Sequence, residues 1–324
     1  MQAASLAVVN YTAVANFQRI TALRNLLLPL LAATMLNPPL SIAQPIEDNP
    51  LSATALANAT YRGLQNDDFA ITLTDGEWQG EPYQPGGAVV PQVQLLGNLI
   101  ARGDVTGDGA EDAVVLVNYA PGGTGQLLHL TLMSVRDGKA QQTAVAFIGD
   151  RVKTRDLRID GDKILLELVQ AGPRDASCCP GELATRQWHF ADGALTEIDS
   201  GVDTGRLSPA ALEGQTWQLA RWQYSEPVSE SAPITLAYED GKFTGNAGCN
   251  NYFAGVVEGD MPGDITVAPT GATRMACPDS ATGAAEQRFL SILPAVRQFS
   301  WMSGQLILSY GEGTETGTLF FDQR

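Results

Sequence analysis

The stretch FTGNAGCNNYFAG at residues 243–255 sets three glycines and three asparagines around a single cysteine. Gly245 and Gly248 permit a turn or a bulge that residues with a Cβ atom would resist. Asn250 and Asn251 can hydrogen-bond to their own backbone, as asparagines in turns often do. The stretch therefore predicts a structural corner.

The residues around this corner alternate between short β-rich runs and turn signals. The runs are TWQLARW, ITLAYEDGKFTG, ITVAPTGATRM, LILSY and TGTLFF. One helix is expected from about Asp279 to Leu293, with Asp279 or Ser280 as its cap and Pro294 limiting its far end. Its apolar residues at near-helical spacing are Ala285, Phe289, Ile292, Leu293 and Val296. The C-terminal region is therefore predicted to be a small, strongly curved sheet with one helix.

Three groups of residues in this region follow a specific order. They are Leu212-x-Gly214-x-x-Trp217-x-Leu219, Gly248-Cys249-Asn250-x-Tyr252 and Thr273-x-Met275-x-Cys277. With the helix and the last two runs, this combination resembles the META domain, also called HslJ-like, over residues 209–324. That family comprises bacterial envelope proteins linked with heat-shock and drug-resistance phenotypes. The resemblance implies a compact α+β fold and an envelope or secreted setting, but neither a catalytic reaction nor a set of active-site residues.

The chain contains four cysteines, a number that suits an exported protein. A disulfide between Cys249 and Cys277 would close a loop of 29 residues and stabilise the fold by about 3.6 kcal/mol. Two free buried thiols are the alternative. Cys178 and Cys179 are adjacent, with Cα atoms about 3.8 Å apart, so that a bond between them would be strained. A vicinal disulfide, a pair of thiols in a turn and a redox-sensing role all remain open for that pair.

The region before the META-like part also reads as mainly β. Residues 58–200 contain the runs AVVLVNY, LLHLTLMSV, TAVAFI, KILLELVQA and RQWHF. Asp-Gly pairs between them, at residues 137–138, 160–161 and 192–193, favour tight hairpin turns. Residues 201–208 lack apolar periodicity and predict a linker, and residues 44–57 predict a flexible tail. The chain is thus expected to be mainly β with two domains.

The N-terminus has the features of a secretory signal peptide at residues 1–43. Arg19 and Arg24 precede the apolar run LLLPLLAATML, and Ser41-Ile42-Ala43 supplies a cleavage site. The run is too short and too interrupted by proline to span a bilayer comfortably. We expect cleavage near Ala43, a periplasmic or secreted mature protein, and no membrane span in that mature chain.

The stretch GDVTGDGAED, residues 103–112, is the one candidate metal site in the sequence. Asp104, Thr106, Asp108 and Asp112 occupy loop positions 1, 3, 5 and 9, and the Ala110 carbonyl occupies position 7. Such a set can wrap oxygen ligands around Ca²⁺, and it resembles the calcium loops of FG-GAP-type β repeats. It departs from an EF-hand because Val115 stands where a bidentate glutamate belongs. A solvated acidic turn and a pair of catalytic carboxylates are the alternatives.

Charge and composition narrow the classes of function. There are 36 acidic and 20 basic residues, a net charge of -16, which disfavours nucleic acid as a partner. The only histidines, His129 and His189, lie in apolar or aromatic runs and are read as packed side chains. We therefore predict a non-enzymatic envelope protein that binds an unidentified protein or small molecule, or acts in stress protection. A secreted hydrolase using the acidic loop, and an inhibitor or chaperone-like partner of another envelope protein, are the rivals.

Overall fold

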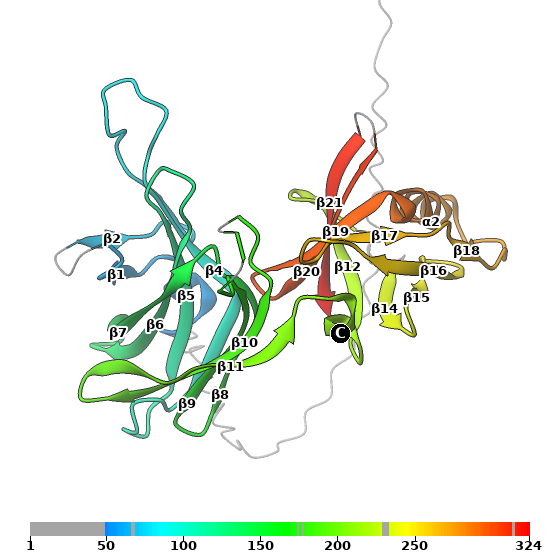
Figure 1. The fold of residues 1–324 in the computed structure, drawn as a ribbon. Helices are drawn as coiled ribbons and strands as arrows, with labels where there is room; N and C mark the ends of the chain where they lie inside the picture. The colour runs from blue at the N-terminus through cyan, green and yellow to red at the C-terminus, as the bar shows by residue number, and fades with distance from the viewer. Residues whose placement is uncertain (1–48, 66–68, 174, 177, 229–232, 313–314) are drawn as a thin grey trace, which may run out of the picture. The chain divides into compact units, whose positions relative to one another are not determined.

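The computed structural model describes residues 49–65, 69–173, 175–176, 178–228, 233–312 and 315–324. The predicted signal peptide and its cleavage site lie outside these residues. Residues Glu47–Arg324 group into one compact unit. The fold is mainly β with one long helix, as the sequence predicts, and its hydrogen-bonded strands pair antiparallel in every sheet (Figure 1).

The elements fall into two consecutive sets along the chain. The first set is α1 (Ala53–Ala57), β1 (Thr60–Arg62), β2 (Ala70–Thr72), β3 (Glu77–Gln79), β4 (Gln92–Gly103), β5 (Asp112–Ala120), β6 (Leu127–Arg136), β7 (Lys139–Asp150), β8 (Lys153–Asp160), β9 (Lys163–Gln170), β10 (Glu182–Ala191) and β11 (Ala194–Arg206). The second set is η1 (Pro209–Leu212), β12 (Thr216–Gln223), β13 (Glu226–Pro227), β14 (Thr235–Glu239), β15 (Lys242–Asn246), β16 (Asn251–Glu258), β17 (Ile265–Val267), β18 (Gly271–Ala272), α2 (Ser280–Ile292), η2 (Leu293–Ala295), β19 (Val296–Met302), β20 (Gln305–Glu312) and β21 (Glu315–Gln323).

Two sheets face one another in the first set. One has the order β3-β4-β5-β6-β7 and the other the order β11-β10-β9-β8. Leu116 and Leu130 from the first sheet join Leu166 and Trp188 from the second in one buried apolar cluster. Alternate residues of β5, such as Val115, belong to a different cluster on the opposite face. Because β5 is buried on both faces, its sequence is a continuous apolar run rather than an alternating one.

The second face of β5 is covered by residues predicted to be a flexible tail. Residues 53–57 form the helix α1, whose cap Ser52 accepts a hydrogen bond from the Ala55 amide through its side chain. Leu51 and Leu56 are 1% and 0% exposed and pack in the cluster with β5. The expectation of a tail is therefore wrong for residues 51–57, because the sheet offers a second apolar face that these leucines cover.

The predicted linker also differs in the structure. β11 continues to Arg206 and pairs with β10, ending at the Glu182↔Arg206 pair. The pairing contains register shifts between Leu183 and Trp188. Backbone hydrogen bonds to a neighbouring strand thus hold a stretch whose Asp, Gly and Ser content favours a loop.

The hairpin turns follow the Asp-Gly signals with one variation. Both residues of Asp137-Gly138, Asp192-Gly193 and Asp240-Gly241 have positive φ angles, between 49° and 79°. This is the conformation of tight type I′ turns. In the pair at residues 160–161, Asp160 closes β8 and only Gly161 has a positive φ. The turn there is shifted by one residue.

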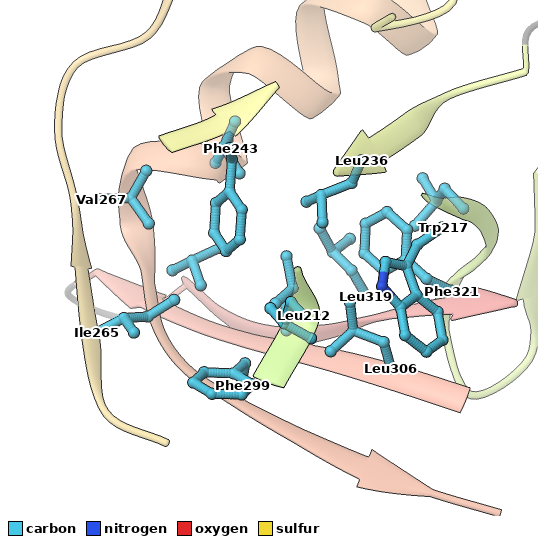
Figure 2. Close-up of a cluster of buried hydrophobic side chains, with 14 of the residues drawn as sticks. Leu212, Trp217, Leu236, Phe243, Ile265, Val267, Phe299, Leu306, Leu319 and Phe321 are labelled. Atoms are coloured by element: carbon cyan, nitrogen blue, oxygen red, sulfur yellow. The ribbon is translucent and has the colours of Figure 1, made fainter. Parts of the chain in front are cut away.

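The second set forms a single curled sheet. Its main path is β17-β16-β15-β14-β12-β21-β20-β19, with β13 beside β12 and β18 beside β16. The two ends of this path meet, since the Phe299 amide donates to the Gly263 carbonyl at 2.8 Å and Asp264 forms a bridge with Gln298. The sheet is therefore nearly closed, which confirms the prediction of a strongly curved sheet. Its interior is filled by aromatic and aliphatic side chains (Figure 2).

Helix α2 packs on this curled sheet as predicted. Asp279 caps it, because its carboxylate accepts hydrogen bonds from the Thr282 amide and hydroxyl, both at 2.8 Å. These bonds lower the pKa of Asp279. The fully buried Phe289 of α2 meets Tyr252 of β16 edge to face, with ring centroids 5.2 Å apart. The helix thus covers β16 through an aromatic contact.

Candidate functional site

The acidic loop between β4 and β5 is closed by its own carboxylates. Six consecutive backbone amides, from Val105 to Ala110, each donate a hydrogen bond to Asp104, Asp108 or Asp112. Asp104 alone accepts three of them, at 2.7 to 3.1 Å. The carboxylates therefore hold the loop in shape as side chain to backbone turns.

Asp112 is the buried member of this loop. It is 1% exposed, and one of its oxygens accepts from the Val105 and Thr106 amides while the other accepts from the Ser134 hydroxyl at 2.6 Å. Thr143 in turn donates to Ser134 at 2.8 Å. The side chain thus ties the loop to β6 and β7, which is a structural role that the sequence pattern does not reveal.

The carboxylates of Asp104, Asp108 and Asp112 do not form a group of ligand atoms that all lie within 4.8 Å of one another. Within the described residues, the only group of three or more Cys, His or acidic ligand atoms that all lie within 4.8 Å of one another is elsewhere in the chain. The Thr106 hydroxyl is shielded from solvent and has no hydrogen-bond partner, and Asp108 is an exposed residue. Asp104 Oδ1 and Asp112 Oδ2 each accept two amides, whereas Asp104 Oδ2 accepts one and keeps a lone pair. Calcium binding through Asp104, Thr106, Asp108, Ala110 and Asp112 remains a prediction.

The corner predicted at residues 245–251 is the loop joining β15 to β16. Gly248 has a φ of 108°, which a residue with a Cβ atom rarely adopts, and its amide donates to the Asn246 side chain at 2.8 Å. Gly245 does not lie in the turn, in contrast to the prediction. It lies within β15, where a Cβ atom would collide with the Thr235 carbonyl. Gly245 therefore permits a close approach of two backbones.

Asn250 connects two of the three motif groups, those at residues 248–252 and 273–277, to helix α2. Its side-chain oxygen accepts from the Thr273 hydroxyl at 2.8 Å and the Met275 amide at 2.7 Å. Its side-chain nitrogen donates to the Met275 carbonyl at 3.1 Å and to Glu286 of α2 at 2.9 Å. Asn250 is 2% exposed, so these bonds replace water almost completely. One buried hydrogen-bond network therefore joins the last two groups of the motif to α2.

Cys249 and Cys277 form a disulfide beside this network, with Cα atoms 5.6 Å apart. Their sulfur atoms and a Glu286 carboxylate oxygen are the group of ligand atoms within 4.8 Å of one another. Because the sulfurs are bonded to each other, they offer no thiolate to a metal. The arrangement is a covalent and hydrogen-bonded lock that joins the β15–β16 loop, residues 273–277 and α2.

Cys178 and Cys179 are joined in a vicinal disulfide. Their loop is held by Asp175, which accepts hydrogen bonds from the Gly172 and Gly181 amides, both at 2.8 Å, and pairs with Arg206 at 2.7 Å. Cys178 is exposed. All four cysteines of the chain are thus paired.

His129 is a packed strand residue, as the sequence predicts. It is 4% exposed, and its ring centroid lies 5.4 Å from that of Phe147. Burial lowers its pKa, although hydrogen bonds to backbone groups of Leu127 and Val117 act in the opposite direction. Its surroundings contain no nucleophile hydrogen-bonded to the ring among the contacts of the described residues.

A cleft of about 490 Å³ has both polar and aromatic side chains in its lining. Strands β4, β5 and β6 and the β7–β8 turn line one side, and residues of β12 and β19 to β21 line the other. The Gly304 amide donates to the Thr154 carbonyl at 3.0 Å, and the Arg155 guanidinium lies 4.6 Å from the centre of the Trp301 ring. These contacts hold the two sides of the cleft together.

The wall of this cleft contains an irregular stretch of β4. The pairing of β4 with β5 breaks between Leu95 and Ile100, so residues 96–99 bulge out of the ladder. Gly97 and Asn98 are exposed there, and a Cβ atom at Gly97 would meet nothing within 4 Å. Bulges of this kind re-aim side chains next to binding sites. The volume of the cleft lies within the range of small-molecule sites.

Together these features define an antiparallel β protein whose C-terminal domain is a nearly closed, disulfide-linked sheet with one covering helix. Residues 210–323 match the family model described as META domain, and this part of the chain is a META domain, as its motif predicts. A comparison with curated proteins gave no match. No helix within the described ranges is long and apolar enough to cross a membrane.

Two solved structures are similar to part of the chain. One is an NMR structure of a protein 19% identical, covering 36% of this chain and 93% of that chain, with a TM-score of 0.29. The other is an NMR structure of a protein from Burkholderia xenovorans, 27% identical, covering 40% of this chain and 97% of that chain, with a TM-score of 0.29.

Proposed function

We propose that the protein is an exported, non-enzymatic binding protein of the bacterial cell envelope. The pairing of all four cysteines into two disulfides carries this proposal, since disulfides form and persist in oxidising compartments such as the periplasm. The signal-peptide pattern of residues 1–43 and the META domain agree with it. The cleft between β4 and β19 supplies a place for a small-molecule ligand.

Export is tested by expressing the full chain in a Gram-negative host and fractionating the cells. We expect a periplasmic product whose intact mass begins at Gln44 and includes two disulfides. Leu31→Arg, which charges the apolar run, should leave the chain uncleaved in the cytoplasm with reduced cysteines. Ala13→Arg lies before the run and should be processed normally. An uncleaved, cytoplasmic, reduced wild-type chain would refute the proposal.

The non-enzymatic part of the proposal has its own test. The purified mature protein is incubated with panels of glycan, ester and peptide substrates, and product formation is followed by mass spectrometry. We expect no turnover with either the wild-type protein or Asp108→Ala. Turnover by the wild-type protein that disappears in Asp108→Ala would instead establish the rival hydrolase hypothesis.

A further inference from the structure

The cleft that β4 shares with β19 has an unusual charge for this protein. The chain has 36 acidic and 20 basic residues, yet the lining of the cleft contains cations and no aspartate or glutamate. The cations are Arg151, Lys153 and Arg221. Although the protein is acidic overall, this carboxylate-free, cationic recess offers an anion a favourable place to bind.

Lys153 supplies a cation that the described residues do not neutralise. No carboxylate of those residues lies within ion-pair distance of its ammonium group. Burial lowers the pKa of Lys153, because the charged form loses hydration without gaining a counter-ion. Arg151, two residues earlier, is paired with Asp150 at 2.9 Å and has a positive φ of 55°. The turn thus presents Lys153 in a fixed place.

Arg221 supplies a second cation whose hydrogen-bond partners are neutral. Its guanidinium donates to the Tyr224 carbonyl at 3.1 Å and to the Gln305 side chain at 2.7 Å. It also lies over the Phe320 ring, with its central carbon 4.4 Å from the centroid. These contacts fix the planar group in place and leave its positive charge without a direct carboxylate.

The rest of the lining suits a hydroxylated ligand. The lining includes the side-chain amides of Gln94, Asn98, Asn118 and Gln126, whereas the amide of Gln305 is already bonded to Arg221 and Asp322. An amide donates and accepts hydrogen bonds at once, as a sugar hydroxyl also does. Tyr224 is 65% exposed and its ring is available to lie against the apolar face of a ring-shaped ligand.

We propose that this cleft binds an acidic sugar, with Lys153 and Arg221 meeting its carboxylate and the amides meeting its hydroxyl groups. The inference rests on the proposed binding function and names the ligand class. A neutral sugar would leave the two cations unmatched, and a simple inorganic anion would not use the amides or Tyr224. The acidic sugar is the class that uses all three kinds of side chain.

The test is calorimetric titration of the mature, disulfide-linked protein with galacturonate at low salt, with galactose as the neutral probe. We expect saturable binding of galacturonate that weakens as sodium chloride is added, and much weaker binding of galactose. Lys153→Gln should weaken galacturonate binding about tenfold or more, since it removes one charge-assisted hydrogen bond. Trigalacturonate tests whether the ligand is a free sugar or the end of a polymer. If the cleft binds a polymer end, trigalacturonate should bind more tightly than galacturonate. If it binds a free sugar, the two affinities should be equal.

Lys139→Gln is the matched control, because Lys139 is exposed and does not line the cleft. It should bind galacturonate as the wild-type protein does. Lys153→Gln should melt no lower than the wild-type protein, because the substitution removes a desolvated charge. Equal binding of galactose and galacturonate, no binding of either, or equal losses in the two lysine variants would overturn the proposal. If the sugar-binding proposal is overturned but the protein is exported with both disulfides intact, the proposed location in the cell envelope is still supported.

Discussion

Replacing Asn250 by alanine should disconnect the network that joins the META motif. The side chain makes four hydrogen bonds with Thr273, Met275 and Glu286, at 2.7 to 3.1 Å. Three of them are neutral and contribute about 1 kcal/mol each, and the bond to the Glu286 carboxylate contributes about 2 kcal/mol. Bonds in one network are not additive, so we expect a loss of about 3–5 kcal/mol in unfolding free energy.

Water does not offset this loss, because Asn250 is 2% exposed and the Met275 amide would lose its acceptor. Asn250→Asp provides a second, sharper variant. It keeps the shape and the acceptor oxygen, but it places a carboxylate oxygen against Glu286 where a donor stood. We expect Asn250→Asp to be destabilised at least as much as Asn250→Ala at neutral pH.

The assay is urea unfolding of the mature, disulfide-linked protein followed by tryptophan fluorescence, with the disulfides confirmed by mass. Asn251→Ala is the control, since Asn251 is exposed and its side chain accepts one hydrogen bond from Asn246. It should change the unfolding free energy by about 0.5 kcal/mol or less. If Asn250→Ala and Asn251→Ala unfold alike with equal m-values, the reasoning from the buried network is refuted.

Three further predictions concern the acidic loop, a buried histidine and the long-range disulfide. Millimolar Ca²⁺ should raise the melting temperature above that measured in EDTA, because a ligand at 100 times its Kd stabilises the folded protein by about 2.7 kcal/mol. The rise should vanish in Asp104→Ala. Equal melting temperatures in the two media would identify the loop as an acidic turn. Burial lowers the pKa of His129, so the unfolded chain binds more protons below about pH 6.5 and stability should fall there as pH falls. Urea unfolding across that range should show a flatter profile for His129→Leu, and an unchanged slope would contradict the assignment. Replacing both Cys249 and Cys277 by serine removes a link of sequence separation 28 and should lower the unfolding free energy by about 3.6 kcal/mol in urea titrations, whereas a change near zero would contradict the entropic estimate.

The sequence predicts local structure best where a backbone conformation can be adopted by only a few residue types. The Asp-Gly hairpins form because few other pairs tolerate two positive φ angles, and α2 begins at Asp279 because its side chain caps the helix. The META motif was recognisable because its residues occur in a fixed order. In the structure Asn250 forms hydrogen bonds with Met275, 25 residues away in the sequence.

The sequence fails where tertiary contacts override local preference. Residues 44–57 are predicted to be a flexible tail, and only the second apolar face of β5 explains why Leu51 and Leu56 pack onto it. β11 crosses a Gly- and Asp-rich stretch because β10 offers backbone partners. In both cases the structure of the segment depends on a neighbouring strand or sheet, which the local sequence does not reveal.

Glu286 shows why part of the candidate site could not be predicted. A glutamate on a helix is usually solvated, and nothing in its local sequence marks it as the partner of Asn250. Lys153 and Arg221 are likewise ordinary cations in the sequence, and they share a cleft only because two distant sets of strands meet. A cationic cleft of this kind depends on which side chains come close together after folding, and the residue types alone do not predict it.

The sequence by itself determined the mainly β class, the hairpin turns, the capped helix and the META motif, since these depend on backbone conformations and spacings that neighbouring residues impose. Only the tertiary structure decided that Asp112 accepts a hydrogen bond from Ser134, that Asn250 and Glu286 bond to one another, and that a carboxylate-free cleft exists. Those features depend on which surfaces remain to be covered and which charges meet after folding, and no local stretch of sequence contains that information.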